Sequence, residues 1–467
     1  MFKKISIFLL VGFLITTGLG CKGISKAELD AIKPISLNYW RVFDDNDSLG
    51  EAISAYRAIH PNITINLKKL NAEDFQAELL NALAEDRGPD IFSIQDTSLR
   101  TYLSKIEPLP SSIKAAFQRV EGTFQKKTVV DIKTVITPVA KTIRTKYIAA
   151  AADTIIIPGR DEKTGQYKEM IYGLPLSVDT LVLYYNKNML DQAGIPEPPK
   201  TWVEFQKDVI KLAKIDQDNK VLRAGAAIGA GINISRSTDI LSLIMMQNGV
   251  AMTDEAGNPT FASTPQGFVG VAPPAEQALQ FYTDFAQPTK EVYTWNDKMP
   301  NSLDAFTRGQ AAFFLGFGYN LPIIRARAPK LIFAIASAPQ INLEAPINYA
   351  SFWVETVSKK TKYSNEAWDF LLFAADAKNV VKYLDKASKT TALRELVADE
   401  KENPDLTVFA NQLLTAKNWY RGKDWTKTDA AFVKMIDGVF VKETINDGDI
   451  YRKAINTAAA EVGQTMY

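Results

Sequence analysis

Apolar residues in the first hundred positions of the chain follow two alternating periods. Three short stretches are rich in β-branched and aromatic residues and predict strands: residues 35–43, 62–70 and 91–95. Between them, apolar residues recur every three or four positions and predict two helices: residues 48–61 and 74–90. Strands that alternate with helices predict a parallel sheet, in which a ligand binds beyond the carboxyl ends of the strands. The loops after Val42 and Gln95 are therefore candidate ligand sites.

Three further segments predict helices in the middle of the chain. Residues 111–150 mix Lys, Val and Ala and read as helices. Thr201 followed by Glu204 predicts a helix start, because the two residues can satisfy each other's unpaired amides. Thr264 followed by Pro265 predicts another helix start. Predicted helices therefore continue well beyond the first hundred residues.

The segment 302–320 combines a helix, a strand and a loop. Its first part predicts a helix that ends at Gly309, since Gly commonly follows a helix. Residues 311–315 are all apolar and predict a buried strand. The loop after this strand is rich in Gly and aromatic residues and carries Tyr319. This loop lies at a strand's carboxyl end and is a third candidate ligand site.

The N-terminal residues have the pattern of an export signal. Two lysines precede an uncharged apolar run, residues 5–15, and small residues lead from this run to Cys21. The run is shorter than the roughly 20 apolar residues that span a bilayer. Cys21 is the only cysteine in the chain, so no intramolecular disulfide can form. We expect residues 1–21 to be a signal peptide and residues 22–34 to be a tether.

Composition and charge indicate how many lobes the chain forms and which kind of partner it binds. The 467 residues are 46% hydrophobic, and a chain of this length is expected to split into two or more lobes. Lys and Arg number 54 and Asp and Glu number 53, so the formal net charge of +1 gives no general attraction to nucleic acid. We therefore expect a neutral small-molecule partner and no nucleic acid.

The residues present also disfavour several enzyme classes. His60 is the only histidine, and its place beside Pro61 at a helix end predicts a solvated side chain. A Ser-His-Asp arrangement is therefore disfavoured, and a zinc site built from histidines is excluded, so we expect no metal. The chain has no G-x-x-x-x-G-K-[ST] phosphate loop. A glycoside-processing enzyme needs only two carboxylates, so composition leaves this alternative open, as it does a lipid-tethered scaffold that binds protein.

Residues 173–190, GLPLSVDTLVLYYNKNML, read as a buried segment that three polar residues around Asp179 interrupt. Its spacing of Pro, apolar, Tyr and Asn residues resembles a motif of the family 1 extracellular solute-binding proteins of ABC importers, the maltose-binding-like group. The chain departs from this motif at Gln192, where the family has a charged residue or Asn. Four other segments resemble the family in the same order: GPDIFSIQD, PPKTWVEF, FTRGQAAFFLG and SFWVETVSKKTKYSNEAWDFLLFAAD. The resemblance extends from about Ile35 to the C-terminus.

The resemblance implies an α/β fold of the two-lobe, periplasmic-binding-protein-like type (type II). Its sheets are expected to be rich in parallel strands and flanked by helices, with a hinge between the lobes. Each lobe is expected to be discontinuous: residues 35–178 plus 356–403, and residues 179–355 plus 404–467.

The resemblance also implies a function. The expected protein is an extracytoplasmic substrate-binding lipoprotein of an ABC importer, which captures a sugar or oligosaccharide in the cleft between its lobes and delivers it to the membrane permease. Cys21 resembles the lipidation site of bacterial lipoproteins, although Gly18 stands where that family prefers Leu. We expect a monomer that is tethered to the cell membrane by its lipid and uses no cofactor.

Candidate ligand-binding residues follow from the same resemblance. Asp179 matches an acidic position that accepts hydrogen bonds from ligand hydroxyls, and Tyr319 matches an aromatic residue that stacks on the sugar. Four more candidates are acidic or aromatic: Trp40 and Asp96 at strand ends, Trp353 at the second crossover, and Trp295 before the helix that ends at Gly309. Asp179 could instead cap the next element or hold the hinge, and each aromatic side chain could instead pack in a core. One loop could also reach the cleft and contains three polar residues: Asn233, Ser235 and Arg236.

Overall fold

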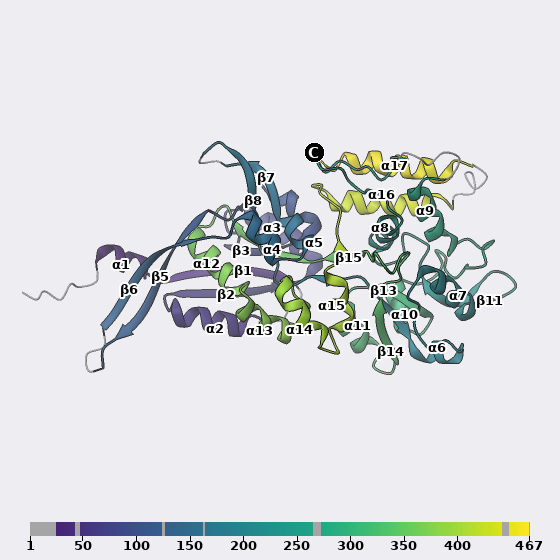
Figure 1. The fold of residues 1–467 in the computed structure, drawn as a ribbon, viewed down its shortest axis with the longest axis horizontal. Coiled ribbons are helices and arrows are strands. Elements are labelled where there is room, and N and C mark those ends of the chain that lie inside the picture. The colour runs from purple at the N-terminus through teal and green to yellow at the C-terminus, as the bar shows by residue number, and fades with distance from the viewer. Residues whose placement is uncertain are drawn as a thin grey trace, which may run out of the picture.

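Two five-stranded sheets, each in its own half of the molecule, organise the chain (Figure 1). The computed structural model describes residues 25–42, 47–123, 127–161, 164–264, 272–440 and 448–466. The predicted signal peptide with Cys21, the first residues of the loop after Val42 and the helix start at Pro265 lie outside the described residues.

The first sheet contains the three strands predicted from the first hundred residues. Its order is β2 (Ile63–Leu70), β1 (Ile35–Val42), β3 (Ile91–Gln95), β16 (Trp353–Ser358) and β4 (Ile106–Glu107). As predicted, β1 runs parallel to β2 and to β3, whereas β16 returns from late in the chain and is antiparallel to β3. The two predicted helices are observed as α2 (Gly50–Ile59) and α3 (Ala72–Ala84). Further helices of this half include α1 (Lys26–Ala31), the 3-10 helix η1 (Asp96–Tyr102), α12 (Ser364–Ala374) and α13 (Ala377–Ala387).

A long hairpin replaces most of the helical structure predicted for residues 111–150. Strands β5 (Ser112–Glu121) and β6 (Lys127–Ile136) pair antiparallel along their whole length and extend away from the first sheet (Figure 1). The helical prediction was wrong here because much of the hairpin is not buried: Val120 and Ile136 are 65% and 76% exposed, so no regular apolar alternation marks the strands. The helical prediction is confirmed for the end of the segment, which forms α4 (Ala140–Lys146) and the start of α5 (Ala149–Ile155). A second hairpin follows: β7 (Ile156–Arg160) and β8 (Tyr167–Ile171).

The second sheet has the order β11 (Lys214–Ile215), β12 (Val221–Ala227), β13 (Ala311–Gly316), β10 (Val182–Asn186) and β14 (Phe333–Ser337). Strand β13 is the buried strand predicted from the sequence, and the helix predicted before it is α10 (Ser302–Thr307). The predicted reciprocal cap is present at α7 (Trp202–Leu212), where Thr201 and Glu204 each accept a hydrogen bond from the other's backbone N–H. The other helices of this half are α6 (Lys187–Gln192), α8 (Ser237–Gln247), α9 (Pro274–Asp284), α11 (Asn320–Arg327), α16 (Trp425–Gly438) and α17 (Ile450–Gly463).

A small three-stranded sheet joins the two halves. Its order is β17 (Ala416–Lys417), β15 (Asn348–Ser351) and β9 (Asp179–Thr180). Strand β9 leads into β10 of the second sheet, and β15 leads into β16 of the first. Strand β17 connects α16 to the preceding helices: η2 (Arg394–Leu396), α14 (Val397–Lys401) and α15 (Thr407–Leu413). We call these three strands the crossing strands. The lobe limits expected from the sequence stay a prediction, although Trp353 already lies in the first sheet.

Each half of the molecule has its own apolar core. Phe92 and Trp368 are fully buried in the first, and Phe205 and Phe313 are fully buried in the second. Burial of apolar surface is the main force that stabilises a folded unit, so each half can hold its shape while the crossing strands connect them.

Candidate ligand-binding site

Asp179 holds the aromatic loop that follows β13. Its Oδ1 accepts hydrogen bonds from the backbone N–H groups of Gly318 (2.9 Å) and Thr180 (2.8 Å), and its Oδ2 accepts one from Tyr319 (3.2 Å). A side chain at position 318 would not fit well, since a Cβ there would lie 3.0 Å from Oδ1. Burial raises the pKa of Asp179 to about 6, although the three N–H groups act in the opposite direction. Asp179 therefore has a structural role at the crossing strands, and its ligand role stays a prediction.

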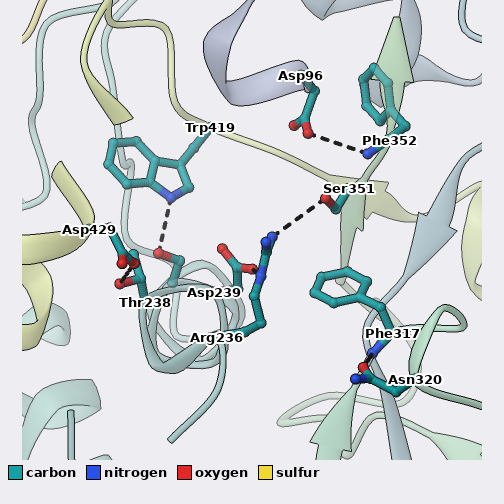
Figure 2. Close-up of polar contacts among 11 residues, drawn as sticks. Asp96, Arg236, Thr238, Asp239, Phe317, Asn320, Ser351, Phe352, Trp419 and Asp429 are labelled. Carbon is teal, nitrogen blue, oxygen red and sulfur yellow. Dashed lines mark hydrogen bonds and ion pairs between the residues drawn. The ribbon is translucent and has the colours of Figure 1, made fainter. Parts of the chain in front are cut away.

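Tyr319 presents an aromatic surface at the same place. It is 38% exposed, and its ring stacks on that of Phe317 with centroids 5.9 Å apart and planes 13° from parallel. Phe317 is fully buried, and Asn320 accepts a hydrogen bond from its backbone N–H (Figure 2). The exposed ring is thus backed by a fixed one, which suits it to cover the apolar face of a sugar.

Asp96 connects the first sheet to two segments near the crossing strands. It begins η1 directly after β3 and is 5% exposed. Its Oδ1 accepts a hydrogen bond from the Phe352 N–H (3.3 Å, Figure 2), and its Oδ2 accepts one from Asn418 Nδ2 (2.9 Å). Burial raises the pKa of Asp96 to about 6, while these hydrogen bonds and the charge of Arg236 oppose that rise.

Arg236 lies at the centre of the polar contacts in Figure 2. It directly precedes α8 with a left-handed φ of 64°, a conformation that is uncommon for residues other than Gly. Its Nε donates to Asp239, and its Nη2 donates to Ser351 Oγ in β15 at 3.4 Å. Its guanidinium carbon lies 4.9 Å from the centroid of the Phe317 ring. Although burial favours the neutral form, Asp239 holds the pKa of Arg236 above its ordinary value. Arg236 therefore ties the second half of the molecule to a crossing strand.

The three tryptophan candidates lie in different surroundings. Trp353 begins β16 two residues after the crossing strand β15, is half-buried and meets Phe75 edge to face. Trp40 lies on β1, where Lys68 Nζ is 4.4 Å from its ring centroid. Trp295 is fully buried in the second core, and its indole N–H donates to Asn233 Oδ1 at 2.9 Å. Full burial of the ring favours core packing for Trp295, and its ligand role stays a prediction.

The other two polar residues of the loop before α8 are occupied by the loop itself. Asn233 Nδ2 donates to the backbone oxygens of Asn296 and Met299, at 2.9 Å each. Ser235 donates to Asn301 Oδ1 at 3.1 Å. These contacts fix the loop that presents Arg236.

The structure thus brings four of the sequence candidates to the crossing strands: Asp96, Asp179, Tyr319 and Trp353. Sequence reasoning missed other polar residues there, chiefly Asn418 and Ser351. Asn418 contacts Asp96 across 322 positions, and no local pattern signals such a pairing.

His60 is buried, so the prediction of a solvated side chain was wrong. It is 1% exposed, its Nδ1 lies 2.9 Å from the Ala116 carbonyl of the hairpin, and its Nε2 lies 3.2 Å from Asp369 in α12. Tyr56 and Phe117 flank its ring. His60 therefore fastens the hairpin to the first half of the molecule.

The described part of the chain has neither a candidate metal site nor a helix suited to span a membrane. None of its groups of His, Cys, Asp and Glu residues could hold a metal ion. None of its helices has the length and apolar character needed to cross a membrane.

Comparison with known proteins assigns the family. A family model described as bacterial extracellular solute-binding protein matches residues 51–408. The chain belongs to this family. The prediction from the sequence motifs is confirmed, and the family's extracellular character implies an extracytoplasmic location.

Individual relatives have low sequence identity to this chain. The chain is 22% identical over 308 residues to the multiple sugar-binding protein of Streptococcus mutans serotype c, which covers 65% of this chain and 71% of that relative. It is 28% identical over 275 residues to the sn-glycerol-3-phosphate-binding periplasmic protein of Yersinia pestis, which covers 54% of this chain and 56% of that relative. The chain thus spans only about half the length of the second relative.

Solved structures of solute-binding proteins share the fold. The cyclic alpha-maltosyl-1,6-maltose binding protein from Arthrobacter globiformis matches with a TM-score of 0.68 at 17% identity, over 93% of this chain and 99% of that one. A cyclo/maltodextrin-binding protein complexed with maltotetraose matches with a TM-score of 0.66 at 14% identity, over 92% of this chain and 97% of that one. The predicted two-lobe, periplasmic-binding-protein-like fold is confirmed.

Proposed function

We propose that the chain is the extracytoplasmic substrate-binding lipoprotein of an ABC importer, which captures a sugar or oligosaccharide between its lobes and delivers it to the membrane permease. Membership of the solute-binding family supports a binding rather than an enzymatic role. Relatives whose names refer to sugars and to sn-glycerol 3-phosphate support a hydroxyl-rich solute.

The observation that carries the proposal is the convergence of polar and aromatic groups from both halves at the crossing strands. Asp96 comes from the first sheet, Asp179 from a crossing strand, and Tyr319 and Arg236 from the second half. Carboxylates have lone pairs for ligand hydroxyls beyond those already used, and Tyr319 offers a partly exposed ring for an apolar sugar face. A few convergent polar groups beside an aromatic surface are typical of small-molecule sites.

Capture then follows from the architecture. The crossing strands act as a hinge, the ligand contacts both lobes, and binding shifts the population toward the closed form that the permease recognises. A lipid on Cys21 keeps the protein at the membrane that holds the permease. A dissociation constant near 1 µM, about −8 kcal/mol, suits such a receptor.

The test is thermal melting of the protein with a panel of mono-, di- and oligosaccharides, polyols and amines. A true ligand at about 100 times its dissociation constant stabilises the fold by about 2.7 kcal/mol. Loss of the Tyr319 ring in Tyr319→Ala should weaken binding about tenfold, since an aromatic contact contributes about 1–1.5 kcal/mol. The ligand's stabilisation should then fall to about 1.4 kcal/mol at the same concentration.

Tyr167→Ala is the matched control, because Tyr167 is 76% exposed on β8 of the second hairpin. It should leave the ligand shift unchanged. Cleavage of any glycoside in the panel would favour the hydrolase alternative. A panel without any shift would count against solute capture and would favour the protein-binding scaffold.

A further inference from the structure

Two arginines, one from each half of the molecule, lie together beside the crossing strands. Arg100 is in η1, and Arg421 follows β17. The two segments meet at both ends of η1: Asn418 Nδ2 donates to Asp96 Oδ2 at 2.9 Å, and Thr101 Oγ1 donates to the backbone oxygen of Lys423. Arg100 directly precedes Thr101 and therefore lies at this contact between the two segments. Burial lowers the pKa of Arg421, and repulsion from the charge of Arg100 lowers it further.

The acceptors that Arg421 contacts are neutral. Arg421 donates to the backbone oxygens of Tyr420 (2.9 Å) and Asn418 (3.4 Å) and to Asn418 Oδ1 (3.2 Å). Burial lowers the pKa of Arg421 and that of Arg100. Among the described residues, no carboxylate oxygen lies within 4 Å of either guanidinium group, whereas the nearby Arg236 is paired with Asp239.

Nearby acids offset the charge of the pair only in part. Asp96 already accepts hydrogen bonds from Asn418 and from the Phe352 N–H, one on each oxygen. Asp153, which is exposed, and Asp96 both raise the pKa of Arg421, but burial and the charge of Arg100 outweigh them. Two half-buried cations that repel one another are unfavourable in a protein unless an anion joins them.

We propose that Arg100 and Arg421 bind an anionic group of the captured solute, a carboxylate or a phosphate, so that the preferred ligand is an acidic sugar and not a neutral one. Guanidinium groups recognise both anions with two parallel hydrogen bonds. One arginine comes from each lobe, so the anion is bound fully only when the lobes come together. The inference rests on the proposed function and names its solute class.

The experiment compares matched pairs of sugars that differ only in an acidic group. Glucose is paired with glucuronate and with glucose 6-phosphate, and galactose with galacturonate, while acetate and inorganic phosphate test the anion alone. Binding to the protein as the cell processes it is measured by calorimetry at low and at high NaCl. The acidic member of at least one pair should bind tenfold or more tightly than its neutral partner, and added salt should reduce that preference.

Arg100→Gln and Arg421→Gln should each reduce the preference to threefold or less and leave the neutral sugar within twofold of its wild-type affinity. Arg119→Gln, on the remote hairpin strand β5, is the control and should change neither value. If Arg421→Gln fails to fold, Arg100→Gln and the salt dependence of the wild type still decide the question. Glucuronate and glucose 6-phosphate distinguish a carboxylate from a phosphate ligand.

Three outcomes would overturn the inference. Equal binding of neutral and acidic sugars would do so while leaving sugar capture intact, and so would a preference that both arginine variants retain. Acetate or phosphate that binds as tightly as the acidic sugars would show that the sugar is not recognised. Absence of binding by every sugar would instead refute the proposed function, and this inference with it.

Discussion

Asp179→Ala should destabilise the unliganded protein, because the carboxylate holds the loop between β13 and α11. Three backbone N–H groups, those of Thr180, Gly318 and Tyr319, lose their acceptor in this variant. A hydrogen bond of this kind contributes about 1 kcal/mol net, and water reaches this half-buried site, so the expected loss is about 3 kcal/mol. Asp179→Asn keeps one acceptor oxygen and avoids the burial of a charge, so its loss should be about 1 kcal/mol.

Gly318→Ala tests the same contact from the other side. Its new Cβ would lie 3.0 Å from Oδ1 and 3.2 Å from Oδ2 of Asp179, so the loop must move away from the carboxylate. The expected loss is about 1–2 kcal/mol in the wild type and less in Asp179→Ala, where only the 3.3 Å approach to Phe409 Cε1 remains.

Urea unfolding of the four proteins in this double-mutant cycle measures both effects. The free energies of unfolding should show a coupling of about 1–2 kcal/mol. Additive losses, or an Asp179→Ala variant within 0.5 kcal/mol of the wild type that still loses ligand binding, would refute the structural reasoning. In the second case, Asp179 would act on the ligand alone.

Three further predictions concern other parts of the chain. His60→Gln removes the contacts to Ala116 and Asp369, so it should cost about 2–3 kcal/mol in urea unfolding and expose the hairpin to limited proteolysis without changing the ligand shift; an unaltered cleavage pattern would contradict this. Cys21→Ser should move the protein from the membrane fraction to the soluble fraction and abolish labelling with palmitate, and labelling that persists would place the lipid elsewhere. Burial raises the pKa of Asp96 to about 6, so the folded state holds this proton more tightly than the unfolded state does. Stability of the wild type relative to Asp96→Asn should therefore fall by up to about 3 kcal/mol as pH rises from about 3 to about 7 and stay level above, and a difference that does not change with pH would be the contrary result.

Local sequence patterns were sufficient to predict a helix or strand where that element buries one regular face. The helix α2 and the strand β3 were predicted because their apolar residues recur at the period of the buried side. The hairpin β5–β6 was missed because its strands extend beyond the lobe and leave apolar residues such as Val120 exposed. Secondary structure that is held mainly by its own strand pairing carries little periodic signal.

The candidate site was predicted only in part, for a related reason. Asp179 and Tyr319 were found because they belong to motifs that resemble a family, and the structure brings them into contact with each other. His60 was misjudged because its buried surroundings come from the hairpin and from α12, neither of which a helix-end position reveals. Arg100 and Arg421 lie in separate segments with no shared motif, and only the fold places them together.

The contact between η1 and the segment after β17 also affects how the lobes move. A rotation that separates η1 from the segment after β17 would break the hydrogen bond between Asp96 and Asn418, and it would also separate Arg100 from Arg421. The first effect opposes opening, whereas relief of the repulsion favours it, so the two partly cancel in the unliganded protein. An anion bound between the guanidinium groups would remove the repulsion and leave the hydrogen bond in place. The anion would then bind the closed form more tightly than the open form. Such a difference in affinity is the condition that any ligand must meet to drive closure.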